Sequence, residues 1–387
     1  MNYGRLTIAG FAITIAATTA CRSDQRPTEP LPATASSPAA SGSASDARLR
    51  APGQFAMAPV GSKKRGGGDC DASLRPFTSA LDFPSKYEGS GKSRDTLNTD
   101  ADRRYKAAMA DLSTLETTSV KVVGRYLQNG DAAGLACIVK VLDNWAQADA
   151  LLGPAPEHTG RAVRKWVLAS ISAAYLRLKL SPTAPLAEFA DQEKHIDAWL
   201  RKLGNRVVAE WPTDVPLNKV NNHYYWTAWA LVATGTALND RALFEYGLRI
   251  YRIFESQVGN DGVLQNELNR KSRALEYHVY ALGPLAMVAA FANANGYPVD
   301  VSPTAPLSRL AALSFSSLGN PDILAGRAGA RQETFDSAAT NYAWMEPYCY
   351  VAQCPDAMQQ QLASVRPLSS TRMGGNLTQI FDRRTTP

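Results

Sequence analysis

The chain has 387 residues, of which 45% are hydrophobic and 20% are charged, and this suits one large globular domain or two small ones. Its formal net charge of +6 favours a polyanion as partner. No long basic tract with interleaved aromatic residues is present, so no nucleic acid is expected, and an anionic lipid surface or an acidic polysaccharide remains.

The first 20 residues form a predicted signal peptide. Arg5 precedes an apolar run over residues 6–17, which is too short to span a bilayer as a mature helix. The run ends in Thr18-Thr19-Ala20-Cys21, and small residues before a cysteine resemble a bacterial lipoprotein cleavage site. Cys21 is therefore a lipidation candidate that would anchor the protein to a membrane. Thr18 stands where such sites usually carry a large aliphatic residue, so cleavage without lipidation is the alternative.

Residues 21–68 are rich in proline, serine and alanine and contain few large apolar residues. Such a composition cannot offset the entropy lost on ordering, so this stretch is predicted to be a disordered tether. Residues 69–387 are predicted to form a single catalytic domain that is large enough for a sizeable core.

Four cysteines remain when Cys21 is set aside, and an even number in an exported protein suggests two disulfides. Cys349 and Cys354 are close enough to close a local loop, which leaves Cys70 to pair with Cys137. Free buried thiols are the alternative. No CxxC motif or spaced set of cysteines and histidines occurs, so no metal site is predicted.

From about residue 101 onward, apolar residues recur at three- and four-residue spacing, which predicts one helix after another. Turn residues separate these segments, and alternating strand patterns are scarce, so the fold is predicted to be all-α. Many antiparallel helical hairpins in one domain favour an α/α toroid, or incomplete barrel, with a cleft lined by inter-helix loops; a solenoid is the alternative. The expected helices span residues 101–128, 132–152, 160–179, 187–209, 224–238, 241–257, 273–295 and 305–318.

The central motif of the chain places two amides, a histidine and three aromatic residues side by side. An asparagine before an apolar run is a preferred helix N-cap, and a helix start readily holds an anion. A capped helix whose aromatic residues pack in the core is the simpler interpretation. The motif is Asn221-Asn222-His223-Tyr224-Tyr225-Trp226.

A second cluster lies on the predicted helix that begins at residue 273. Arg273 and Tyr280 are seven residues apart, so they project on one face with an offset of about 20°. Tyr277 lies on the same face, which therefore carries one guanidinium and two phenols. A solvated face is the alternative. Gly283-Pro284 is expected to kink or end the first part of this helix.

These motifs together resemble the alginate lyases of polysaccharide lyase family five, which are poly(β-D-mannuronate) lyases. The resemblance runs through nearly all of the chain after the predicted tether, with the motifs in the family's order. They are Ser85-Lys86-Tyr87-Glu88-Gly89-Ser90, His158-Thr159-Gly160, the central motif, Asn266-Glu267-Leu268, the run from Arg273 to Leu282, Tyr342-Ala343-Trp344 with Glu346-Pro347-Tyr348-Cys349, and Arg372-Met373-Gly374-Gly375.

The resemblance implies an (α/α) toroid with a deep cleft, a signal peptide, a periplasmic location and no cofactor. It implies that an acidic polysaccharide, alginate, is the partner; we expect the protein to be a monomer. The family's catalytic positions fall on Asn222, His223, Arg273 and Tyr280. The substrate-binding candidates are Lys86, Tyr87, His158, Thr159, Trp226, Tyr277 and Arg372. Residues 87–93 are interpreted as a lid that closes over the polymer.

The reaction expected of such a site is β-elimination at a uronate. Asn222, His223 and Arg273 would stabilise the charge that develops on the carboxylate. Tyr280 is our choice for the group that removes the C5 proton and returns a proton to O4, with its anion favoured by Arg273. The competing assignment makes His223 the base and Tyr280 only the acid. All of this requires that the four residues meet at one cavity.

Three other functions fit parts of the pattern. A glycoside hydrolase on the same fold needs two facing carboxyl groups, for which Glu267, Glu276 and Glu346 are available. A non-catalytic polysaccharide-binding protein would need the basic cleft but not Tyr280. A lyase for another polyuronate, such as glucuronan, would use the same elimination machinery.

Overall fold

The computed structural model describes residues 47–61, 70–71, 73–89, 91–333 and 338–382. The predicted signal peptide, Cys21 and most of the predicted tether lie outside the described residues. The compact unit that carries the helices is Arg48–Pro387.

Residues 48–61 of the predicted tether belong to this unit, so the boundary expected at residue 69 is too late. Leu49 and Phe55 are at most 1% exposed, and Phe55 lies in η1 (Gly53–Ala56). The backbone N–H of Leu49 donates to Asn239 Oδ1 at 2.8 Å, and that of Arg50 donates to Asn295 Oδ1 at 2.8 Å. The composition of the whole stretch concealed these few apolar residues, which bury enough surface to order their neighbours.

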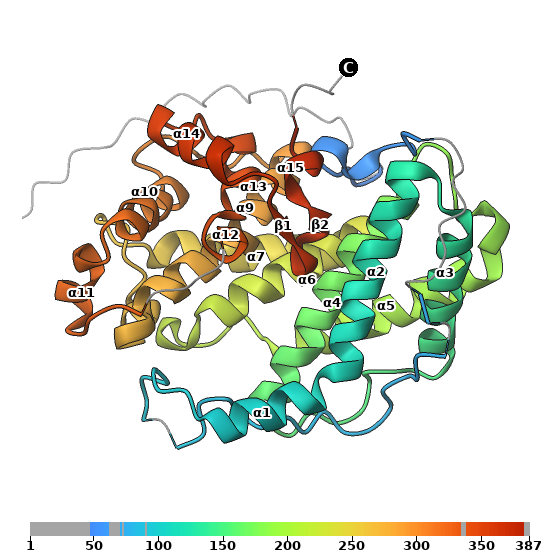
Figure 1. Ribbon diagram of the computed structural model, residues 1–387, viewed down its shortest axis with the longest axis horizontal. Coiled ribbons are helices and arrows are strands. Elements are labelled where there is room, and N and C mark those ends of the chain that lie inside the picture. The colour runs from blue at the N-terminus through green and yellow to red at the C-terminus, as the bar shows by residue number, and fades with distance from the viewer. Residues whose placement is uncertain (1–46, 62–69, 72, 90, 334–337, 383–387) are drawn as a thin grey trace, which may run out of the picture. The chain divides into compact units, whose positions relative to one another are not determined.

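The described residues form an almost entirely helical structure, which confirms the all-α prediction (Figure 1). The α-helices are α1 (Thr99–Ala108), α2 (Ala110–Asn129), α3 (Ala132–Gln147), α4 (His158–Lys179), α5 (Ala190–Glu210), α6 (Asn222–Leu238), α7 (Arg241–Gln257), α8 (Gln265–Leu268), α9 (Ala274–Ala294), α10 (Pro306–Gly319), α11 (Asp322–Ala328), α12 (Ala338–Tyr342), α13 (Met345–Val351), α14 (Asp356–Val365) and α15 (Leu377–Ile380). Besides η1, the 3-10 helices are η2 (Ala187–Phe189), η3 (Leu217–Lys219), η4 (Lys271–Arg273) and η5 (Thr371–Met373). The strands β1 (Ser369–Ser370) and β2 (Gly375–Asn376) pair antiparallel around η5.

The helices form an inner and an outer set. α4, α6 and α9 are buried on nearly every side, and α2–α4, α4–α6, α6–α9 and α9–α13 pack against one another in succession. The helices that follow them in the chain, α5, α7 and α10, each keep an exposed face. Figure 1 shows α2, α4 and α6 side by side. Inner helices that alternate with outer ones along the chain are the arrangement expected of an α/α toroid.

The helix α9 runs without interruption through Pro284, so the alternative that its first part ends at Gly283-Pro284 is wrong. Proline removes one backbone hydrogen bond, and the packing of a helix whose residues are almost all buried outweighs that loss. The segment Lys271–Ala294 is also long and apolar enough to cross a membrane, but 89% of its most apolar window is buried within the protein. It is therefore the central core helix.

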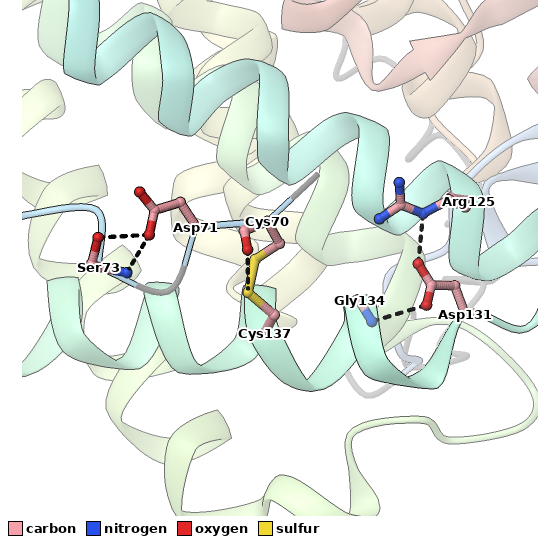
Figure 2. Close-up of a disulfide and its surroundings, with 7 residues drawn as sticks. All are labelled: Cys70, Asp71, Ser73, Arg125, Asp131, Gly134 and Cys137. Carbon is pink, nitrogen blue, oxygen red and sulfur yellow. Dashed lines mark hydrogen bonds and ion pairs between the residues drawn. A yellow bond between two sulfur atoms is a disulfide. The ribbon is translucent and has the colours of Figure 1, made fainter. Parts of the chain in front are cut away.

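The structure contains both disulfides that the cysteine count suggested, Cys70–Cys137 and Cys349–Cys354. Figure 2 shows Cys137 on α3 joined to Cys70 on the segment beside it. The same close-up shows how α3 begins: Asp131 Oδ1 accepts from the backbone N–H of Gly134 at 3.0 Å, and Arg125 Nε donates to Asp131 Oδ2 at 2.5 Å. The disulfide thus ties the segment that contains Cys70 to a capped helix.

Candidate active site

A cavity of about 240 Å³ lies where the N-terminal ends of α4 and α6 meet the first turns of α9. The loop before α1 and the 3-10 helix η5 complete its walls. The lining residues are Ser85, Lys86, Tyr87, Arg94, Tyr105, His158, Thr159, Ala162, Trp166, Asn222, His223, Arg270, Glu276, Tyr277, Tyr280 and Arg372.

Most of the residues predicted from the sequence meet at this cavity, although they come from segments far apart in the chain. Asn222, His223 and Tyr280, three of the four predicted catalytic residues, line it together. Six of the predicted substrate-binding residues also line it: Lys86, Tyr87, His158, Thr159, Tyr277 and Arg372. Trp226 lines an adjoining cavity, and its ring lies 5.0 Å from that of Tyr280.

Arg273 does not line the cavity, so the guanidinium expected beside Tyr280 is a different one. Arg273 pairs with Glu276 and, at 2.9 Å, with Glu333. Its backbone forms the end of η4, where the chain is not yet α-helical. The assumption that Arg273 and Tyr280 share one continuous helix face therefore fails at the helix start.

Arg372 in η5 holds the phenol of Tyr280. Its Nη1 donates to the phenolic oxygen of Tyr280 at 2.8 Å, and its guanidinium stacks 4.5 Å from the centre of the Trp166 ring. Burial raises the pKa of Tyr280 above its usual value, and the charge of Arg372 opposes that rise. The residue that favours the tyrosine anion is thus Arg372, which is 92 positions further along the chain.

His223 lies in a cage of aromatic rings and one amine. Its ring centre is 4.5 Å from that of His158, and the ring of Trp211 stacks on it at 5.8 Å. Its Nδ1 lies 3.1 Å from Nζ of Lys165, a fully buried residue of α4. Burial, and then the positive charge of Lys165, keep the pKa of His223 well below its usual value and lower that of His158 to about 4. Both imidazoles are therefore neutral near pH 7.

The two asparagines of the central motif have separate roles. Asn221 is the N-cap of α6, where its Oδ1 accepts from the backbone N–H of His223 at 3.0 Å. Asn222 is buried, and its backbone N–H and Nδ2 donate to the two carboxylate oxygens of Glu267 at 2.5 and 2.9 Å. Asn222 Oδ1 has no hydrogen-bond partner among the described residues. The capped helix predicted as the simpler interpretation is present, and it coexists with a site.

The predicted lid residues contact the far wall of the cavity. The hydroxyls of Tyr87 and Tyr277 are 2.8 Å apart. Arg270 donates to the backbone oxygens of Ser93 and Arg94 at 2.7 and 2.5 Å, and its guanidinium lies 3.6 Å from the Tyr277 ring centre. Arg270 therefore joins the loop before α1 to the start of α9. Closure of this loop over a polymer stays a prediction.

The cavity carries an excess of positive charge. Lys86, Arg94, Arg270 and Arg372 line it against a single carboxylate, that of Glu276. An adjoining cavity lined by Arg94 and Arg270 adds further cations, Lys92, Arg161 and Lys219. Across the described part of the chain, no cluster of three or more histidine, cysteine, aspartate or glutamate side chains could hold a metal ion. The site is suited to an anionic ligand longer than one sugar.

Residues 82–324 match the sequence model of the Alginate lyase family. An alginate lyase of Azotobacter vinelandii is 40% identical over 344 residues, which cover 88% of this chain and 92% of that protein. The chain belongs to the alginate lyase family. One of Pseudomonas aeruginosa PAO1 is 39% identical over 333 residues, 86% of this chain and 90% of that protein. As a family member, the protein is a polysaccharide lyase.

Solved structures of alginate lyases share the fold. A histidine-to-alanine variant of alginate lyase A1-III complexed with tetrasaccharide superposes with a TM-score of 0.69 at 23% identity, covering 83% of this chain and 88% of that one. Alginate lyase A1-III from Sphingomonas species A1 gives a TM-score of 0.68 at 23% identity, covering 88% of this chain and 92% of that one. The prediction of an α/α toroid is thereby confirmed.

Sequence reasoning about this family member missed three residues that surround the catalytic candidates. Lys165 is a charge inside an apolar helical stretch, and this is the sequence signal by which it can be found. Glu267 was named in a family motif and as an acid for hydrolysis, whereas in the structure it holds Asn222. Arg270 lies three residues before Arg273, and nothing in the local pattern says which of the two reaches the cavity.

Proposed function

We propose that this lyase cleaves mannuronate-rich alginate by β-elimination and leaves a 4-deoxy unsaturated uronate at the new non-reducing end. One observation carries this proposal: Tyr280, His223, Asn222 and Arg372 line the same cationic cavity. Proteins named alginate lyase that align with nearly the whole folded part of the chain support the substrate class.

The reaction breaks two bonds of one uronate and forms a double bond. Tyr280, as its phenolate, takes the proton from C5; the C–H electron pair becomes the C4–C5 double bond, and the bond between C4 and O4 breaks. O4 leaves with the electron pair of that bond and takes the proton back from Tyr280, so the enzyme ends in its starting state. The hydrogen bond from Arg372 favours the phenolate against the effect of burial.

The charge that develops on the uronate carboxylate needs fixed donors. We assign this work to His223 and to the second N–H of Asn222, together with the cations that line the cavity. Glu267 orients Asn222 through two hydrogen bonds, so the amide does not have to reorganise during the reaction. Arg273 adds positive charge behind the cavity wall, where it pairs with Glu276 and its guanidinium lies 5.4 Å from the centre of the Tyr87 ring.

The preference for mannuronate follows from the use of a single proton-transfer group. In mannuronate the C5 hydrogen and O4 lie on the same face of the ring, so one phenol can serve both. In guluronate, the C5 epimer, they lie on opposite faces, and a second group is needed. Tyr280 lines the cavity and its phenolic oxygen accepts a hydrogen bond from Arg372, which supports the mannuronate assignment.

The glycoside hydrolase alternative lacks its acid pair. Glu276 is the only carboxylate among the residues that line the cavity, and it pairs with Arg273. Glu267 is held by Asn222, and both oxygens of Glu346 accept from Arg366 at 2.7 to 2.8 Å. Two facing carboxyl groups are therefore not available to protonate a leaving group and attack the sugar.

The test incubates the purified protein with mannuronate-rich alginate, guluronate-rich alginate and glucuronan and follows the ultraviolet absorbance of the unsaturated product. Rapid absorbance growth with the mannuronate polymer alone is expected. Faster growth with guluronate or glucuronan would overturn the substrate assignment. Reducing ends without absorbance would mean hydrolysis. Tyr280→Phe is expected to remove turnover, and near-normal turnover in that variant would refute its role as base.

We also propose that the protein is exported to the periplasm by residues 1–20, anchored by lipidated Cys21, and active as a monomer. The sequence motif supports the anchor. Membrane fractions of cells that express the wild type should contain the protein, and those that express Cys21→Ser should not; a soluble wild type would refute the anchor. Light scattering of the solubilised protein should give the mass of one chain, and a larger mass would refute the monomer.

A further inference from the structure

Lys165 is a buried amine directly behind the catalytic histidine. Its side chain is fully buried in α4, and its Nζ lies 3.1 Å from Nδ1 of His223. The Nζ atom also lies 3.8 Å from the centre of the Trp211 ring and 5.0 Å from that of Trp166. Within the described part of the chain it forms no ion pair with a carboxylate. A buried lysine without an acidic partner is costly, which points to a function.

We propose that Lys165 is a positioning residue that donates a hydrogen bond to Nδ1 of His223 and thereby holds the imidazole with its hydrogen on Nε2, aimed at the substrate. This inference rests on the lyase function proposed above and adds to it a residue and a protonation state. His223 then acts as a donor toward the uronate, and Tyr280 is left as the base.

The assignment follows from which atoms can donate. An ammonium group has donors and no acceptor, so a ring nitrogen that contacts it must accept. A neutral imidazole has one hydrogen, which must then be on the other nitrogen. Burial and the charge of Lys165 keep the pKa of His223 well below its usual value, so the ring is neutral. Nε2 has no hydrogen-bond partner among the described residues, and His223 lines the cavity.

The charge of Lys165 decides which tautomer His223 adopts. A neutral amine could accept a hydrogen bond from Nδ1–H of His223, and Nε2 would then carry no hydrogen and could only accept. Burial, and then Arg372, lower the pKa of Lys165. The two indole faces favour the ammonium, and so does the carboxylate of an incoming uronate.

The groups that face this amine come from several elements. They are His223 of α6, His158 at the start of α4, Arg372 of η5 and the tryptophans Trp166 and Trp211. None of them is an acid, and a bound uronate would bring a carboxylate toward Lys165. The two protonation states of Lys165 thus predict opposite roles for His223, donor or base, and the tautomer can be measured.

The first experiment records nitrogen–hydrogen correlation spectra of the full chain labelled with ¹⁵N-histidine, free and with a mannuronate oligomer added to Tyr280→Phe. The chain has four histidines, and His223→Asn assigns the signal. The expected result is a neutral His223 ring with its hydrogen on Nε2 in both samples. A hydrogen on Nδ1 in the sample with oligomer would overturn the proposal. The spectrum reports the tautomer of His223 whether or not the protein turns over substrate. A failure of this proposal can therefore be distinguished from a failure of the proposed function.

The second experiment replaces the amine by Lys165→Met, which keeps the length and removes the donor. The expected result is a mixture of tautomers at His223 and a kcat lower by about 10²-fold, with KM little changed. Lys179→Met is the matched control in the same helix, because Lys179 pairs with Glu193 and Asp197 and does not line the cavity. Unchanged kcat and an unchanged tautomer in Lys165→Met would overturn the proposal. If that variant does not fold, the spectrum of the wild type decides.

Discussion

Glu267 makes the stability of this lyase depend on pH in a way that one substitution should remove. The side chain is 1% exposed, and its two oxygens accept from the backbone and the side chain of Asn222. Burial raises the pKa of Glu267 from 4.5 to about 7, and the hydrogen bonds from Asn222 limit the rise. The folded protein therefore binds this proton more tightly than the unfolded chain does.

The sign and size of the effect follow from linkage. A carboxyl whose pKa is raised on folding stabilises the folded state fully below pH 4.5, and that contribution is lost as the pH rises through about 7. A shift of about 2.5 pKa units corresponds to about 3 kcal/mol of unfolding free energy, at 1.36 kcal/mol for each unit. Because glutamine does not titrate, the unfolding free energy of Glu267→Gln should not show this decrease as the pH rises.

Chemical denaturation gives the unfolding free energy of the wild type and of Glu267→Gln at about pH 5 and about pH 8. The change between the two pH values is then compared between the two proteins, so that the contributions of the other titrating groups cancel. The unfolding free energy of the wild type should fall by up to about 3 kcal/mol more than that of Glu267→Gln. Glu188→Gln is the control, since Glu188 is exposed and should follow the wild type. Equal slopes for the wild type and Glu267→Gln would show that the buried carboxyl does not titrate in this range.

Three further predictions concern the same fold and site. Replacing Cys70 and Cys137 by serine should lower the unfolding free energy by up to about 4 kcal/mol, because the bridge closes a loop with a sequence separation of 67; denaturation curves that match the wild type would contradict this. Arg372→Lys should move the rise of kcat with pH, which the deprotonation of Tyr280 sets, to higher pH, because lysine cannot both stack on Trp166 and donate to Tyr280; an unmoved rise would exclude Arg372 as the partner of the phenol. Added salt should raise KM for the polymer much more than it changes kcat, because the cavity is cationic, and a salt-independent KM would mean that charge does not hold the substrate.

The long helices of this protein could be located because their signals are local, although the helix expected over residues 101–128 is two helices, α1 and α2, and the one expected over residues 132–152 ends at Gln147. Apolar spacing located α7 at both ends, and an asparagine of the central motif was expected to cap α6, which begins at Asn222 rather than at the expected residue 224. The two disulfides followed from a count of cysteines and one short spacing. Helix periodicity and capping depend on residues a few positions apart, and four cysteines allow only a few pairings. The sequence alone therefore carries the information for both.

The central motif and the family resemblance also located most of the cavity, since they name residue types that the chemistry needs. They could not say which cation reaches the phenol. Arg273 lies on η4, before the regular turns of α9, and pairs with acids, whereas Arg372 arrives from a hairpin folded against α2 and α4. A spacing argument assumes one continuous helix, and it fails where the helix has not yet begun.

Tertiary packing alone decided the surroundings of the catalytic groups. Lys165 becomes the partner of His223, and Glu267 that of Asn222, only when α4, α6 and the segment before α9 converge. The sequence specified the elements and the reactive side chains through short-range periodicity, capping and composition. The structure decided protonation, orientation and partner choice, because these depend on burial and on contacts between residues that are distant along the chain.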